Sequence, residues 1–229
     1  MVRKEVWILN TIQLGPMVMN FDLLIFLLSS FIGYLALKYR LRMANVEAKI
    51  SDKFINALIL GFFTWKFSPI IFDPVSVIQY PLSILYFNGG DRGIGLAIAV
   101  SAIFLWVRTK KDGTSVMMNL DVLGTGWIAG SAVYHLLLLT VDRMNLVFHT
   151  LHIFLIVVLF IWLYKKKRSV GNALILFRIM LWYSLGIIGI SFLEKERTYF
   201  LFGFSKEQIL FFAVFFIALF VGSAFEKKK

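Results

Sequence analysis

The chain has 229 residues, of which 59% are hydrophobic and 16% are charged, with a formal net charge of +11 and no cysteine. A soluble domain is nearer half apolar and a quarter charged, and here the apolar residues fall in blocks of about 20, the length that crosses a bilayer as a helix. The composition therefore excludes an ordinary soluble domain, and the lack of cysteine excludes thiol catalysis, disulfides and thiolate metal sites.

The apolar blocks predict an all-α, polytopic integral membrane protein that forms a single transmembrane domain, residues 1–229. Residues 1–16 are too weakly apolar for a signal-peptide core and are taken as mature sequence. Of the spans, the third is short and is expected to extend into its flanks. The seven predicted spans are Met17–Leu37, Phe54–Phe72, Gly93–Val107, Met117–Leu139, Asn145–Tyr164, Gly171–Leu193 and Glu207–Phe225.

Lysine and arginine are unevenly distributed between the two sets of predicted loops. The loops after spans one, three and five, together with the C-terminus, hold about twice as many as the N-terminus and the other loops. The positive-inside rule then places the N-terminus outside and the C-terminus in the cytoplasm. Basic runs such as KYRLR (38–42) are interpreted as topology signals and contacts with anionic lipid, not as a nucleic-acid site. We expect a multi-pass membrane protein.

The segment DPVSVIQYPLSILYFNGGDR (73–92) lies on the predicted outer side, between spans two and three. Its two prolines prevent one long helix, yet apolar residues recur at roughly helical spacing. This pattern predicts a broken amphipathic arm in the outer interface. The apolar positions are Val75, Ile78, Leu82, Leu85 and Tyr86. The second outer loop, residues 194–206, carries aromatics suited to the headgroup region.

The end of this arm, GGDRGIG (89–95), leads into span three. Gly89 and Gly90 permit a turn with positive φ, while Gly93 and Gly95 permit close helix approach. Free backbone N–H groups at the start of the helix, with Arg92 beside them, would suit a phosphate oxygen. Phosphate contact and plain helix packing both remain open as interpretations.

Several ionisable side chains fall inside the predicted spans, where a charge costs roughly 2.5–3.5 kcal/mol at mid-bilayer, so each is a candidate functional residue. The predicted topology places Asp22, Lys66, His135, His149 and His152 in the outer leaflet. We expect them to surround a polar cavity that opens outward. Taken singly, each residue fits a structural role better than a functional one, as an interfacial or snorkelling side chain.

Spacing and depth give these residues expected neighbours. His149 and His152 lie three residues apart and share a helix face. His135, at matching depth on the preceding helix, is expected to face His149. Asp121 and Arg178 belong to the inner half and are expected to pair with each other.

The order and spacing of several motifs resemble the prolipoprotein diacylglyceryl transferase family, from about Leu14 to Phe225. The resemblance implies a seven-span enzyme of the bacterial cytoplasmic membrane that moves the diacylglyceryl group of phosphatidylglycerol onto a lipobox cysteine. The segments that carry it are LGP (14–16), GFFTWKFSPIIF (61–72), the outer arm through FNGG (87–90), Asp121, and FSKEQIL (204–210) at the start of the last helix.

Most signature residues of that family are replaced in this chain. Ile94 stands at the histidine of the family's His-Gly-Gly, and His135 stands at the arginine of its Gly-Arg-x-Gly-Asn signature. Asp22 falls where the family has tyrosine, and His149 where a glutamate often occurs. The family mechanism therefore does not carry over by position.

Two classes of function remain open, an enzyme and a binding protein. The first is a transferase that binds phosphatidylglycerol-type lipid in the outward cavity and passes a lipid-derived group to a lipoprotein precursor. Histidine suits the base, and cations suit the developing phosphate charge. In this version His135 is the base, His149, His152 and Asp22 orient it, and Lys66, Arg92, Gly89 and Gly90 hold the phosphate.

The second class is a catalytically inactive relative that binds lipid or lipoprotein, or serves as a partner subunit. Two minor alternatives are a haem or metal protein that uses the three histidines, and a transporter; otherwise no cofactor and no metal are expected. The expected partners are phosphatidylglycerol-like phospholipid and a lipoprotein precursor, with no nucleic acid.

Overall fold

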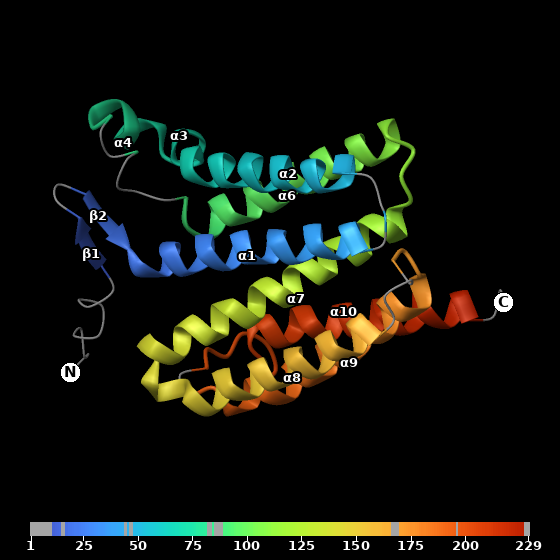
Figure 1. The fold of residues 1–229 in the computed structure, drawn as a ribbon. Helices are drawn as coiled ribbons and strands as arrows, with labels where there is room; N and C mark the ends of the chain where they lie inside the picture. The colour runs from blue at the N-terminus through green and yellow to red at the C-terminus, as the bar shows by residue number, and fades with distance from the viewer. Residues whose placement is uncertain are drawn as a thin grey trace. The chain divides into compact units, whose positions relative to one another are not determined.

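The computed structural model describes residues 11–14, 17–43, 45, 48–81, 84, 89–165, 170–195 and 197–226, and they are mainly helical (Figure 1). Among them, seven helices are long and apolar enough to cross a membrane, which confirms the predicted all-α polytopic membrane protein. Their bounds are Leu23–Met43, Ile50–Phe72, Gly90–Lys111, Val116–Val141, Arg143–Leu163, Ala173–Leu193 and Lys206–Glu226. The third span extends into both flanks, as expected.

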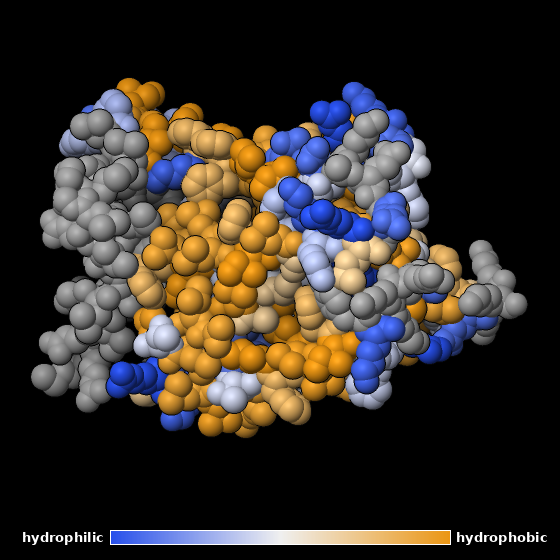
Figure 2. All heavy atoms as spheres, in the orientation of Figure 1, coloured by the Kyte–Doolittle hydropathy of each residue, from blue (hydrophilic) through white to orange (hydrophobic). Residues whose placement is uncertain are grey.

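The chain divides into two compact units. The first comprises Met1–Met19 and Glu47–Val116, and the second comprises Asn20–Val46 and Met117–Lys229. Each unit is described by itself. Figure 2 shows that hydrophobic side chains cover much of the visible surface, as lipid-facing helices require.

The start of the first predicted span is not helical. β1 (Thr11–Leu14) and β2 (Met17–Asn20) form a two-stranded sheet, and α1 (Phe21–Met43) begins only after it. The prediction of a span from Met17 was wrong at this end, because a short apolar run alone does not distinguish strand from helix.

In the first unit, prolines break the chain that follows α2 (Ala48–Phe67). Pro69 begins α3 (Pro69–Phe72) and Pro74 begins α4 (Pro74–Gln79), the first helical position at which proline is tolerated. The Asp73 carboxylate caps α4 by accepting a hydrogen bond from the Ser76 amide, 3.4 Å away. The predicted break in the helix is therefore confirmed up to Tyr80, and the position of the arm in the outer interface stays a prediction. Its predicted positions Leu82, Leu85 and Tyr86 lie outside the described residues.

The glycines of GGDRGIG serve helix packing. Gly89 and Gly93 lie at the start of α6 (Gly90–Lys111), and a Cβ atom on either would overlap the Ser68 hydroxyl at the end of α2. A Cβ atom on Gly89 would also lie 2.7 Å from the Trp65 carbonyl oxygen, whereas Gly95 faces open space. This packing explains two of the four glycines without a ligand.

The same packing continues along both helices. A Cβ atom on Gly61 would lie 2.6 Å from the Ser101 hydroxyl, which donates a hydrogen bond of 3.0 Å to the Ala57 carbonyl. Gly89, Gly93, Ala97 and Ser101 are four residues apart, so small residues line one face of α6. Small residues let helix backbones approach closely in a membrane protein.

The second unit contains α1, α7 (Val116–Val141), α8 (Leu146–Lys165), α9 (Ala173–Ile190) and α10 (Lys206–Glu226). Helices α9 and α10 lie side by side, and α8 packs on α9 (Figure 1). Their buried residues Ile156, Ile179, Ile187 and Phe211 belong to one hydrophobic core. Gly33 of α1 meets Gly126 and Gly130 of α7 at another close helix contact.

α1 continues to Met43, although the predicted span ended at Leu37. Arg40, expected in a cytoplasmic loop, is instead buried in this helix and donates to both carboxylate oxygens of Asp121, at 3.0 and 2.9 Å. The Gly171 amide donates to the same carboxylate at 2.9 Å.

The predicted pair between Asp121 and Arg178 was therefore wrong. Arg178 instead donates to the Glu226 carboxylate at 2.8 Å, where both side chains are exposed. Spacing within a helix could not identify Arg40 as the partner, because the pair joins positions 81 residues apart.

The loop between α9 and α10, predicted to lie outside, contains a tight aromatic turn. Leu201 and Phe204 form an antiparallel bridge across Phe202 and Gly203, both of which have positive φ. The Arg197 guanidinium lies over the rings of Phe192 and Tyr199, at 4.8 and 4.9 Å. These rings hold the cation by cation–π attraction.

The start of α10 explains part of FSKEQIL. The Ser205 hydroxyl accepts from the Gln208 amide at 3.2 Å, and the Gln208 side-chain oxygen accepts from the Ser205 amide at 2.9 Å. This reciprocal arrangement is a capping box. The motif therefore has a structural role at the beginning of the last helix.

Candidate functional site

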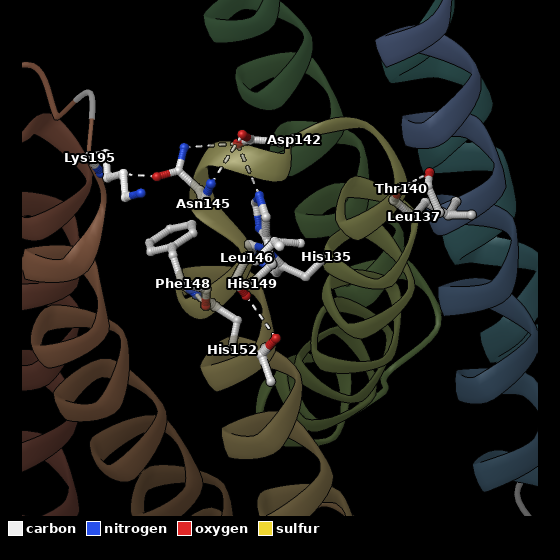
Figure 3. Close-up of polar contacts among 11 residues, drawn as sticks. His135, Leu137, Thr140, Asp142, Asn145, Leu146, Phe148, His149, His152 and Lys195 are labelled. Carbon is white, nitrogen blue, oxygen red and sulfur yellow. Dashed lines mark hydrogen bonds and ion pairs between the residues drawn. The ribbon is translucent and has the colours of Figure 1, made fainter.

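All three histidines of the chain gather at one end of the second unit (Figure 3). His135 lies near the end of α7, and His149 and His152 lie in the first two turns of α8. The turn between the helices, η1 (Arg143–Asn145), reverses the chain and sets the rings together. All three side chains are buried.

His135 and His149 face each other, which confirms the expectation from their matching depth. Their Nδ1 atoms are 2.9 Å apart, within hydrogen-bond distance. The Nε2 atom of His149 lies 3.2 Å from the Asp142 carboxylate. We call His135, His149 and Asp142 the histidine chain.

The partners assign the protons on these rings when both are neutral. A carboxylate only accepts, so His149 donates from Nε2, and its Nδ1 is then an acceptor. His135 therefore donates from Nδ1, which leaves a lone pair on its Nε2. The two hydrogen bonds then have the same direction: His135 donates to His149, and His149 donates to Asp142.

His152 packs against the chain without joining it. Its ring stacks on His135, with 4.0 Å between centroids and 22° between planes. Its Nδ1 lies 3.2 Å from the Phe148 carbonyl, which can only accept, so Nε2 of His152 also carries a lone pair. Stacking and burial together limit the orientations open to the His135 ring.

Asp142 is held at the end of the chain by Asn145. The Asn145 side-chain amide donates to the carboxylate at 2.9 Å and its backbone amide donates at 3.3 Å. The Asn145 side-chain oxygen accepts from the Lys195 backbone amide at 3.0 Å. Figure 3 shows these contacts converging on Asp142. Asn145 thus ties the carboxylate to the loop after α9.

The surroundings keep Asp142 ionised. Partial burial by itself would raise the pKa of this carboxyl, but hydrogen bonds from Asn145 and His149 outweigh it and leave the pKa below its usual range. The pKa of Glu194 is raised, first by burial and also by the nearby charge of Asp142, while Arg197 and His149 oppose the rise. Two carboxyl groups with opposite shifts therefore lie beside His149.

Sequence reasoning missed Asp142. It lies just beyond the predicted end of span four at Leu139, so it was not counted among intramembrane charges. A signal was present: DRMN (142–145) has Asp and Asn placed to cap the turn that starts the next helix. The predicted orienting residue, Asp22, lies in the first turn of α1, and its side chain lies outside the described part.

The predicted phosphate ligands belong to the first unit. Lys66 is half-buried near the end of α2, and Arg92 is exposed in the first turn of α6. Because Trp65 and Ser68 contact the glycines that begin α6, Lys66 and Arg92 lie at the same end of this helix pair. Gly90 has a positive φ of 53°.

A metal bound between His135 and His149 does not fit this geometry. Metal–nitrogen bonds of about 2.0–2.1 Å place two tetrahedral ligands about 3.3 Å apart, and the two Nδ1 atoms are already in hydrogen-bond contact at 2.9 Å. Among the described residues, no group of three or more His, Asp or Glu side chains is placed to hold a metal ion. The arrangement instead suits proton transfer.

A scan against models of protein families finds no match for this sequence, and a search of curated proteins finds no relative.

Proposed function

We propose that this protein is a membrane-embedded transferase of the prolipoprotein diacylglyceryl transferase type, with His135 as its general base. The observation that carries the proposal is the histidine chain, in which His149 joins a buried His135 to Asp142. A base oriented by a second group, which is in turn oriented by a carboxylate, is a recurring arrangement for activating a nucleophile.

In the proposed step, His135 Nε2 takes the proton of a substrate thiol. The thiolate sulfur bonds to a glyceryl carbon, and the bond from that carbon to the phosphate oxygen breaks. The phosphate leaves with the electron pair. His149 and Asp142 stabilise the imidazolium that forms, because a carboxylate nearby favours the charged ring.

The lipid is proposed to be an anionic phospholipid such as phosphatidylglycerol, with a lipoprotein precursor as acceptor. A phosphate contact within the first unit is a separate proposal, supported by the pair of cations Lys66 and Arg92 at one end of α2 and α6. The glycines beside them give no further support, because packing explains Gly89 and Gly93.

A binding role is the second candidate, and the burial of the rings favours it. His152 is only 1% exposed, and His149 only 3%. Such a cluster would also suit a relative that has lost its chemistry and keeps the histidines as a packed polar core. It would then bind lipid or lipoprotein, or serve as a partner subunit.

One assay separates these functions. Protein in phosphatidylglycerol vesicles is mixed with a lipobox peptide, and modified peptide is measured by mass spectrometry. We expect product, and we expect His135→Gln to lower the rate by at least about 100-fold, the usual contribution of a general base. The control is Thr140→Val at the same end of α7, because the Thr140 hydroxyl only bonds the Leu137 carbonyl of its own helix.

The same assay tests the lipid contact. Lys66→Ala and Arg92→Ala are expected to raise the phosphatidylglycerol concentration needed for half-maximal rate. A full-signature diacylglyceryl transferase serves as the positive control. If that enzyme gives product and this protein gives none, the transferase proposal fails; phospholipid retained by the purified protein would then favour the binding role.

A further inference from the structure

The histidine chain runs from a buried nitrogen to a partly exposed carboxylate. His135 is buried, His149 lies between, and the Asp142 side chain is 33% exposed. With both rings neutral, His135 donates to His149 and His149 donates to Asp142, at 2.9 and 3.2 Å. Protons can pass along such a series of hydrogen bonds while the residues keep their positions.

We infer that Asp142 is the port through which protons pass between the buried histidines and the solution. A proton bound at His135 Nε2 allows His135 to give its Nδ1 proton to His149 Nδ1. His149 then gives its Nε2 proton to Asp142, which releases it to water. Each ring gains and loses one proton, and the reverse sequence restores both.

This inference deepens the proposed function and rests on it for its catalytic use. The movement of protons itself can be measured without any substrate. A thiol proton taken by a buried base would otherwise remain as an imidazolium in a dry site, where charge is costly. Transfer to Asp142 releases that proton to water.

Other charged groups lie near Asp142. The charges of Asp142, His149 and Arg197 all act on the Glu194 carboxyl. The pKa of Asp142 lies below its usual range, so this carboxyl is ionised near neutral pH and releases a transferred proton readily to water. The charge of Glu194 also acts on the Glu207 carboxyl. His152 stacks on His135 and is not part of the series of hydrogen bonds that reaches Asp142.

Asn145 is the positioning residue of the port. It donates twice to Asp142 and is itself fixed by the Lys195 amide. Without it the carboxylate would be free to turn away from His149. Asn145 therefore acts on the histidines only through Asp142.

The test uses the fact that the chain has only three histidines. The intact protein, labelled with ¹⁵N in histidine alone, is studied by NMR in lipid. We expect His149 as the Nε2–H tautomer, His135 and His152 as Nδ1–H tautomers, and a scalar coupling across the bond between His135 and His149. Exchange of the two chain protons with water is then measured as a function of pH.

Asp142→Asn keeps the shape of the side chain and removes its charge. We expect this variant to slow exchange of the His149 and His135 ring protons by at least about tenfold, in the range of a lost acid–base group. Glu194→Gln is the matched control, because it removes a nearby carboxylate that is not bonded to His149, and it should slow exchange far less. Asn145→Ala should give an intermediate loss.

Equal exchange in Asp142→Asn and the unaltered protein would overturn the port, as would missing coupling between the two rings. Ring coupling and slowed exchange in a protein that modifies no lipobox peptide would retain the port and reject the transferase. Modified peptide, together with exchange that Asp142→Asn does not slow, would retain the transferase and reject the port. The two proposals therefore fail separately.

Discussion

Two ion pairs in the second unit differ in what surrounds them. Arg40 and Asp121 are buried in the region where α1 meets α7, and the Gly171 amide adds a third contact. Arg178 and Glu226 form a pair of similar length, 2.8 Å, with side chains about half exposed. Water screens the second pair but not the first.

Removal of one partner should therefore have unequal effects. Arg40→Ala leaves Asp121 as an unpaired buried carboxylate and is expected to destabilise the protein by about 3–5 kcal/mol. Arg178→Ala, the matched control, is expected to cost about 0–1 kcal/mol. Unfolding in detergent, followed by circular dichroism, measures both. Similar losses in the two variants would contradict the assignment of Arg40 as a buried partner.

At the scale of single residues, the sequence predicted the contacts of the histidines better than those of the carboxylates. Depth and helical spacing were enough to place His135 opposite His149. They could not identify Asp142, because a residue in a turn between spans has no helical period. They could not pair Asp121 with Arg40 either, since that contact depends on how α1 and α7 cross.

At the scale of helices, small residues decide how α2 and α6 pack. Gly93 faces Ser68 and Trp65, whereas Gly95, two residues on, points to open space. The sequence left helix packing and phosphate contact open for this stretch, because glycine suits both. Only the position of the partner helix distinguished them.

Substitution at the two glycines should separate packing from intrinsic helix preference. Gly93→Ala is expected to destabilise the first unit, because its Cβ atom would overlap the Ser68 hydroxyl. Gly95→Ala should be neutral or stabilise by up to about 1 kcal/mol, since alanine is the better helix former. Melting temperatures in the same detergent decide the matter. An equal response at both positions would mean that the glycines are not packing sites.

For the whole molecule, the apolar pattern predicted the seven spans to within a few residues, except where strand β2 precedes α1 and where α1 runs on to Met43. The ends were less certain because basic residues such as Arg40 can continue a helix. The orientation across the membrane follows from the distribution of cations and remains a prediction.

The absence of native cysteine makes the orientation directly measurable. Thr198→Cys lies in the loop predicted outside, and Lys111→Cys at the end of α6 predicted inside. A membrane-impermeant maleimide should label the first variant in intact cells and the second only after permeabilisation. Labelling in the reverse order would invert the topology and place the histidine chain at the cytoplasmic end.

The bond between Asn145 and position 195 uses main-chain atoms on one side. The donor is the Lys195 backbone N–H, so the identity of that side chain does not matter to the contact. Nineteen of the twenty common amino acids supply the same N–H, and proline alone lacks it. Sequence variation at 195 would therefore be wide, with a single forbidden residue, in any protein that keeps this coupling.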